Sequence, residues 1–269
     1  DPAPATDPAP ADVSGELVGA GASSQTAAMD GWKAGFAEVA PDVSISYDPI
    51  GSGGGRKTFL DGGSDFAGSD SALKPEEFEA SKAVCGDLGA ISVPHYISPI
   101  AVAYNLPGVD ALQLSPDTVA GIFANTITNW NDPAIVADNP GVTLPDQGII
   151  VAHRSDGSGT TSIFTTYLSS VSEAWASGPG VGKDVNWPAP SSVGGEKNDG
   201  VTAQIQQNPG AIGYIELSYA LINGIPVADV VNADGNAITP TLESTAAAAD
   251  GIEIPDDLRF NILDVGGEG

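Results

Sequence analysis

Short apolar runs alternate with longer stretches of mixed polar and apolar residues over most of the chain. Each run ends in glycine and serine and is followed by a helix-compatible stretch, a pattern typical of α/β proteins. The apolar runs predict strands at Glu16–Ala20, Val43–Tyr47, Asp65–Gly68, Ile97–Tyr104, Ile149–His153 and Ile212–Ile215. The intervening stretches predict helices at Gln25–Val39, Pro75–Ala83, Pro116–Phe123, Thr161–Leu168 and Val201–Gln207. The sequence therefore predicts an α/β fold.

Two segments depart from this alternation. The opening Asp1–Asp12 is rich in proline, alanine and aspartate, which predicts an extended tether. No hydrophobic core of a signal peptide precedes it. We therefore expect a processed exported protein whose globular part is held at a distance from a membrane or cell wall. The glycine- and proline-rich stretch Gly178–Gly200 predicts a long surface loop.

The charge of the chain excludes one class of partner. It carries 9 lysines and arginines against 35 aspartates and glutamates, a net charge of −26. Nucleic acids and anionic membrane surfaces would be repelled, and the carboxylates are expected to serve solubility. The single cysteine, Cys85, cannot form an internal disulfide and is expected to be a buried thiol.

Three strand-to-helix junctions are crowded with glycine and small hydroxyl residues: Gly19–Ser24, Gly51–Gly55 and Ser155–Thr161. Glycine lets backbone N–H groups approach a ligand, a helix beginning there adds a positive dipole, and hydroxyls add donors. One such turn is a common connection in any α/β protein. Three of them together indicate a cradle for a small tetrahedral oxyanion.

Two charged residues stand at the same kind of junction. Arg154, one of three arginines, precedes the third glycine-rich stretch, and its planar donor fork matches an oxyanion. Asp70 follows a predicted strand, where ligands bind in open α/β sheets. The alternative for Asp70 is an N-cap for the helix beginning near Pro75.

Other site types fit the sequence poorly. A Walker A loop needs glycine where Arg56 stands, and the dinucleotide-binding motif needs glycine where Ser24 stands. A serine-hydrolase triad is not supported, because only His95 and His153 are present and no nucleophile elbow is found. Acidic residues are scattered rather than clustered as metal ligands. We therefore predict no catalytic residue, no metal and no cofactor.

Taken in order, seven motifs resemble the PstS-type periplasmic phosphate-binding proteins of bacterial ABC phosphate importers. They are Gly19–Ser23, Ile50–Gly54, Asp65–Asp70, Asn129–Asp132, Arg154–Thr160, Gly195–Gly200 and Pro209–Tyr214. The resemblance implies a two-lobed, type II periplasmic-binding-protein fold with phosphate in the cleft between the lobes. By matching position, it implies phosphate ligands Ser23, Ser24, Ser52 and Asp70 from the first lobe and Arg154, Ser158, Gly159 and Thr160 from the second.

The chain departs from the family at two places. Ser24 stands where the family usually has an aromatic residue; the expected contact there is the backbone N–H, so binding should survive while a hydrophobic wall is lost. The chain also stops before the segment with which the family completes its first lobe. Either the sequence belongs to a longer polypeptide or a separate chain supplies that segment, since an incomplete lobe leaves backbone groups and apolar surface uncovered.

The resemblance implies four parts: a tether over residues 1–14, lobe 1 over 15–95, lobe 2 over 96–250, and a truncated return segment toward lobe 1 over 251–269. The implied function is extracytoplasmic capture of inorganic phosphate, without covalent chemistry, and delivery to the membrane permease of an ABC importer. Two alternatives remain open. One is a binding protein for sulfate, molybdate or a phosphonate, and the other is a phosphomonoesterase.

Overall fold

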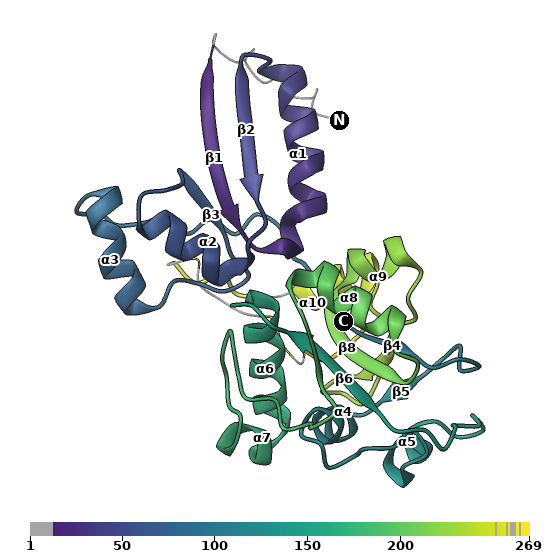
Figure 1. The fold of residues 1–269 in the computed structure, drawn as a ribbon. Helices are drawn as coiled ribbons and strands as arrows, with labels where there is room; N and C mark the ends of the chain where they lie inside the picture. Colours follow the sequence, from purple (N-terminus) through teal and green to yellow (C-terminus); the bar gives the residue numbers. More distant parts are fainter. Residues whose placement is uncertain (1–12, 251, 257, 259–261, 264) are drawn as a thin grey trace.

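Two bodies, joined by residues 86–99, make up the computed structural model, as Figure 1 shows. It describes residues 13–250, 252–256, 258, 262–263 and 265–269, so most of the expected tether lies outside the described residues. We call the body before residue 86 lobe 1 and the body from residue 100 onward lobe 2. Purple and blue elements of lobe 1 lie above the teal, green and yellow elements of lobe 2 in that view.

Lobe 1 is built on a parallel sheet of three strands in the order β2-β1-β3. Its elements are β1 (Gly15–Gly21), the 3₁₀ helix η1 (Ser23–Gln25), α1 (Thr26–Val39), β2 (Val43–Asp48), α2 (Gly51–Leu60), β3 (Phe66–Gly68) and α3 (Pro75–Cys85). Because parallel strands end at the same edge of a sheet, the junctions that follow β1, β2 and β3 are neighbours.

Helix α2 begins at the second glycine-rich junction, Gly51–Gly55, and was not among the helices expected from the sequence. Glycine costs up to about 1 kcal/mol per residue in a helix, but here it permits close approach. A Cβ at Gly55 would lie 2.3 Å from the Cα of Gly21, and one at Gly53 would lie 2.8 Å from the carbonyl oxygen of Gly157 in lobe 2. The sequence did not predict this helix, because the low helix propensity of glycine is overridden here by tertiary packing.

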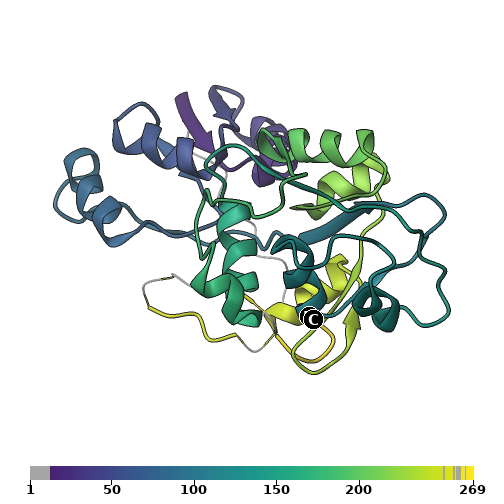
Figure 2. The ribbon, with the colours of Figure 1, turned by 60° about the horizontal axis from the view of Figure 1, so that its bottom comes forward.

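Lobe 2 contains a mixed sheet in the order β4-β8-β6-β7 and a small sheet in the order β10-β9-β5. Strand β4 is antiparallel to β8, whereas β6 is parallel to both of its neighbours. The elements are β4 (Ile100–Asn105), β5 (Gln113–Leu114), α4 (Pro116–Phe123), α5 (Pro133–Asp138), β6 (Ile150–Arg154), α6 (Gly159–Val171), α7 (Glu173–Ser177), β7 (Val193–Gly195), α8 (Lys197–Gln207), β8 (Ala211–Glu216), α9 (Leu217–Asn223), β9 (Asp229–Val231), β10 (Ala237–Ile238) and α10 (Leu242–Ala249). Figure 2 shows α6 beside the sheet from a second direction.

The two lobes differ in their cores. Among the described residues, both clusters of buried hydrophobic side chains belong to lobe 2, where Trp130 and Trp175 are fully buried. In lobe 1, Trp32 and Phe36 of α1 are 42% and 40% exposed. Cys85, expected to be buried, is exposed. Lobe 1 therefore presents apolar surface that its own described residues do not cover.

The predicted surface loop Gly178–Gly200 was only partly correct. It contains strand β7, which pairs with β6, and the start of α8. Trp187 from the same stretch stacks on His153 with 5.0 Å between ring centroids. The local glycine and proline content did not reveal these tertiary contacts.

The last part of the chain touches both lobes. Leu258 lines a small cavity with Phe78 and Ile91, while Asn232 of lobe 2 donates to the carbonyl oxygens of Gly267 and Gly269 at 3.1 Å. Among the described residues of the expected return segment, Leu258 thus lies beside lobe 1, and Gly267 and Gly269 lie against lobe 2. Among the described residues, no helix combines the length and apolar character needed to cross a membrane.

Candidate functional site

Asp70 follows β3 and lies at the junction edge of the lobe 1 sheet. Its carboxylate accepts hydrogen bonds from the hydroxyls of Ser24 and Ser52, the latter at 3.2 Å, and its backbone N–H donates to Ser52 Oγ at 3.2 Å. The alternative role as a helix cap is wrong, because the N-cap of α3 is Lys74. Asp70 is therefore a side-chain acceptor inside the site.

Burial raises the pKa of Asp70 above its usual range. The hydrogen bonds from Ser24 and Ser52, and the positive charge of Arg154, oppose this shift without overcoming it. The carboxyl group is thus more easily protonated than that of an ordinary aspartate. Its hydroxyl donors favour the ionised form, but their effect is smaller than that of burial.

Arg154 ends β6 in lobe 2 and is only 3% exposed. Its Nε donates to Asp156 Oδ1 at 2.7 Å, Nη2 donates to Asp156 Oδ2, and Nη1 lies 3.5 Å from the hydroxyl of Thr160. Burial would raise the pKa of Asp156, but the bonds and charge of Arg154 outweigh it and lower that pKa. Asp156 therefore positions the guanidinium.

The residues after Arg154 form the start of helix α6. Ser158 is its N-cap, and the hydroxyl accepts from Thr161 N at 3.0 Å. Gly159 and Thr160 are the first helical residues, so their N–H groups carry the positive end of the helix dipole. Both residues are buried against lobe 1, and a Cβ at Gly159 would lie 2.5 Å from Asp70 Oδ2.

Direct contacts join the lobes around this point. Gly53 N donates to the carbonyl oxygen of Gly157 at 2.8 Å. The hydroxyl of Ser23 accepts from Asn198 Nδ2 at 3.0 Å, and Tyr219 Oη donates to the carbonyl oxygen of Ser23 at 2.8 Å. Ser23 thus faces lobe 2, whereas Ser24 and Ser52 face Asp70.

The structure therefore groups most of the predicted ligands. Ser24, Ser52 and Asp70 of lobe 1 meet Gly159 of lobe 2, with Thr160 beside them. The Ser158 hydroxyl caps helix α6. The hydroxyl and the carbonyl oxygen of Ser23 accept hydrogen bonds from lobe 2. Sequence reasoning missed Asp156 and Asn198, although both lie inside motifs already singled out, Arg154–Thr160 and Gly195–Gly200.

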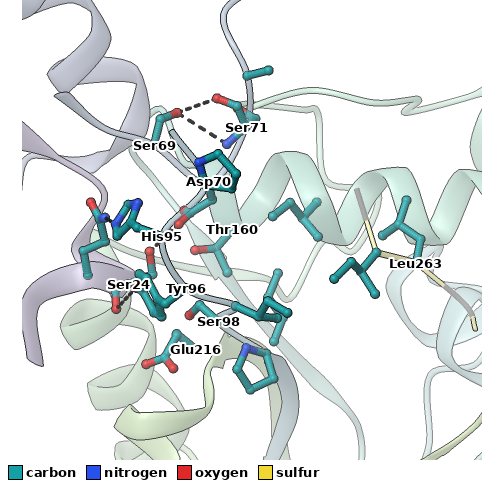
Figure 3. A pocket seen from close by; sticks show the side chains of 18 of the residues that line it. Ser24, Ser69, Asp70, Ser71, His95, Tyr96, Ser98, Thr160, Glu216 and Leu263 are labelled. Atoms are coloured by element: carbon teal, nitrogen blue, oxygen red, sulfur yellow. Dashed lines mark hydrogen bonds between the residues drawn. The ribbon is translucent and has the colours of Figure 1, made fainter. Parts of the chain in front are cut away.

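The polar cluster borders a larger apolar cavity of about 1230 Å³ between the lobes. Figure 3 shows Ser24, Asp70 and Thr160 together on one side and Leu263 on the other. Apolar side chains from both lobes, among them Phe66 and Ile163, line the remainder. Among the described residues, no three histidine, cysteine, aspartate or glutamate side chains gather as metal ligands.

This arrangement suits a small oxyanion that carries a proton. Hydroxyls, one guanidinium and the N-termini of α2 and α6 are donors for anionic oxygens, while the Asp70 carboxylate can accept a hydrogen bond. A carboxylate beside an anion is otherwise unfavourable, so the acceptor selects for a proton on the ligand.

Known proteins resemble this chain over most of its length. A family model described as a PBP superfamily domain matches residues 6–259. Phosphate-binding protein PstS of Xylella fastidiosa (strain Temecula1) is 39% identical over 250 residues, 92% of this chain and 66% of that protein. Phosphate-binding protein PstS of Methanocaldococcus jannaschii is 38% identical over 229 residues, 82% of this chain and 58% of that protein. The chain thus spans less than two thirds of these relatives' length.

Solved structures share the fold at lower identity. A human phosphate binding apolipoprotein superposes with a TM-score of 0.69 at 24% identity, over 89% of this chain and 69% of that one. A phosphate binding protein from Stenotrophomonas maltophilia gives 0.61 at 24% identity, over 87% and 72%. The two-lobed α/β fold expected from the sequence is confirmed.

Proposed function

Since this chain belongs to the PstS-type phosphate-binding proteins of the PBP superfamily, we propose that it captures inorganic phosphate between its lobes and delivers it to an ABC importer. The observation that carries the proposal is the meeting of Asp70, an acceptor, with the donors Ser24, Ser52 and Thr160 and the nearby Arg154. The proposed ligand set also includes Ser23, Ser158 and Gly159. These residues would contact phosphate through backbone groups, or through side chains that rearrange when phosphate binds.

The proposal includes an extracytoplasmic location, a tether over residues 1–14, lobes dividing near residue 95, and a membrane permease as partner. The net charge of −26 supports a globular part that does not adhere to anionic surfaces. Binding without turnover is proposed, because the curated relatives are named as binding proteins.

Isothermal titration calorimetry with phosphate, sulfate, molybdate and methylphosphonate tests the ligand. Phosphate has five heavy atoms, so a ceiling of about 1.5 kcal/mol per atom gives a Kd of roughly micromolar order. We expect phosphate to bind at least 100-fold more tightly than sulfate, a roughly 3 kcal/mol preference. Stronger binding of another anion would replace phosphate as ligand, and steady hydrolysis of p-nitrophenyl phosphate would favour the phosphomonoesterase alternative.

Arg154→Lys should weaken phosphate binding although the charge is retained. A lysine ammonium cannot reproduce the guanidinium fork that engages both Asp156 and an oxyanion. Losing one charge-assisted hydrogen bond predicts a loss of about 1.5–3 kcal/mol, or roughly 10- to 150-fold in Kd. Calorimetry measures this, with the exposed Lys57→Arg as control. An unchanged Kd in Arg154→Lys would remove Arg154 from the site.

We also propose that further polypeptide, from the same chain or a separate one, covers lobe 1. Strand β3 is at the edge of its sheet and borders the apolar cavity, and Leu88 and Ile91 of the adjoining segment 86–99 are 88% and 85% exposed. An uncovered strand edge beside apolar surface is unfavourable in water.

Hydrogen exchange on residues 1–269 alone should therefore show weak protection in β1, β2 and β3 and strong protection in β6 and β8. The physical reason is the absence of a buried apolar cluster around the described lobe 1 strands. Equal protection in the two lobes, measured without another chain, would mean that lobe 1 needs no cover.

A further inference from the structure

Each oxygen of the Asp70 carboxylate has its own hydroxyl donor. Ser52 Oγ donates to Oδ2 at 3.2 Å, and Ser24 Oγ donates to Oδ1. Ser24 is 5% exposed, and its carbonyl oxygen accepts from Tyr96 Oη at 3.1 Å, so the residue is fixed from two sides. Figure 3 shows Ser24, Tyr96 and Asp70 gathered in this way.

The two serines act on Asp70 differently. Ser52 also accepts from the Asp70 backbone N–H, so it shapes the junction after β3 as well as the carboxylate. The Ser24 hydroxyl donates to the carboxylate oxygen Oδ1. Removing that hydroxyl would take one donor from the carboxylate, while the backbone contact of Ser52 would remain.

Resting on the proposed phosphate-binding function, we propose that Ser24 is a specificity-determining residue whose hydroxyl keeps Asp70 ionised and able to accept a hydrogen bond from the proton of bound phosphate. A hydrogen bond donated to a carboxylate stabilises its charged form. Without it, the neutral carboxyl persists to higher pH. A neutral carboxyl donates a hydrogen bond and therefore accommodates sulfate, which has no proton to give.

Other groups around Asp70 act in both directions. The positive charge of Arg154 favours the ionised carboxylate, whereas burial and a nearby carboxylate disfavour it. The charged and titratable groups that interact with Asp70 are Arg154, Arg56, Tyr47, Tyr96 and Glu216. Substitution of Ser24 leaves all five in place, so a change in the pH profile is assigned to the hydroxyl.

The test is calorimetry of Ser24→Ala with phosphate and with sulfate from pH 5 to pH 8.5. We expect the pH below which sulfate competes with phosphate to rise by about one unit, since one charge-assisted hydrogen bond corresponds to about a tenfold change. Ser69→Ala is the matched control, because Ser69 Oγ donates to the Ser71 carbonyl oxygen at 2.7 Å in the same junction. Its profile should equal that of the wild type.

The proposal is overturned if Ser24→Ala binds phosphate and sulfate begins to compete at the same pH as in the wild type. If Ser24→Ala fails to fold, the isosteric pair Ser24→Thr and Ser24→Val decides it, because only threonine keeps the hydroxyl. A valine profile shifted from the threonine profile supports the proposal, and identical profiles overturn it. Failure of the wild type to bind phosphate at any pH overturns the proposed function instead.

Discussion

Asp70→Asn should let sulfate compete with phosphate at neutral pH. In the wild type, a fully ionised sulfate would place an oxygen acceptor against the Asp70 carboxylate with no hydrogen between them and two like charges close together. Asparagine offers an amide that donates to either anion. Discrimination built around one needed hydrogen can reach roughly 10⁴-fold, so most of that ratio should be lost, mainly through improved sulfate binding.

Competition of sulfate against labelled phosphate measures this effect in both proteins. Asp61→Asn makes the same change of charge on the surface, where Asp61 pairs with Lys57, and should leave the ratio unchanged. Because burial already raises the pKa of Asp70, acid should protonate the wild-type carboxyl and bring it toward the behaviour of Asp70→Asn. Equal rejection of sulfate by wild type and Asp70→Asn would show that Asp70 does not select the ligand.

Gly159→Ala should lower phosphate affinity about 100-fold or more. A Cβ at Gly159 would lie 2.3 Å from Ser52 Oγ and 2.5 Å from Asp70 Oδ2, both in lobe 1. Van der Waals overlap of that size forces the lobes apart or displaces both side chains. Loss of about two charge-assisted hydrogen bonds to phosphate, each contributing roughly 1.5 kcal/mol or more, would lower the affinity by about this amount.

A neighbouring glycine provides the control for this substitution. A Cβ at Gly157 would lie 3.6 Å from the Cα of Gly53, which is an ordinary van der Waals distance. Gly157→Ala should therefore bind phosphate within a few-fold of the wild type by calorimetry. Wild-type affinity in Gly159→Ala would mean that the lobes do not approach this closely when the ligand is bound.

Much of the local structure could be predicted from the sequence. The strands near Val43 and Ile212 and the helices beginning at Pro75 and Pro116 correspond to β2, β8, α3 and α4, because hydrophobic periodicity and proline at a helix start act over a few residues. The junctions that follow β1, β2 and β3 likewise indicated where Ser24, Ser52 and Asp70 gather, because the parallel strands of one sheet end at the same edge.

By itself, the sequence determined the α/β pattern, the acidic surface and the two charged candidates, Asp70 and Arg154. Only the tertiary structure decided how Ser23 and Ser24 differ, since one faces Asn198, 175 residues away, and the other faces Asp70. Tertiary packing also determined that the glycines of Gly51–Gly55 lie in helix α2, and it left apolar side chains of lobe 1 exposed. The physical reason is that these outcomes depend on contacts between distant segments, whereas propensity and periodicity report only on neighbours along the chain.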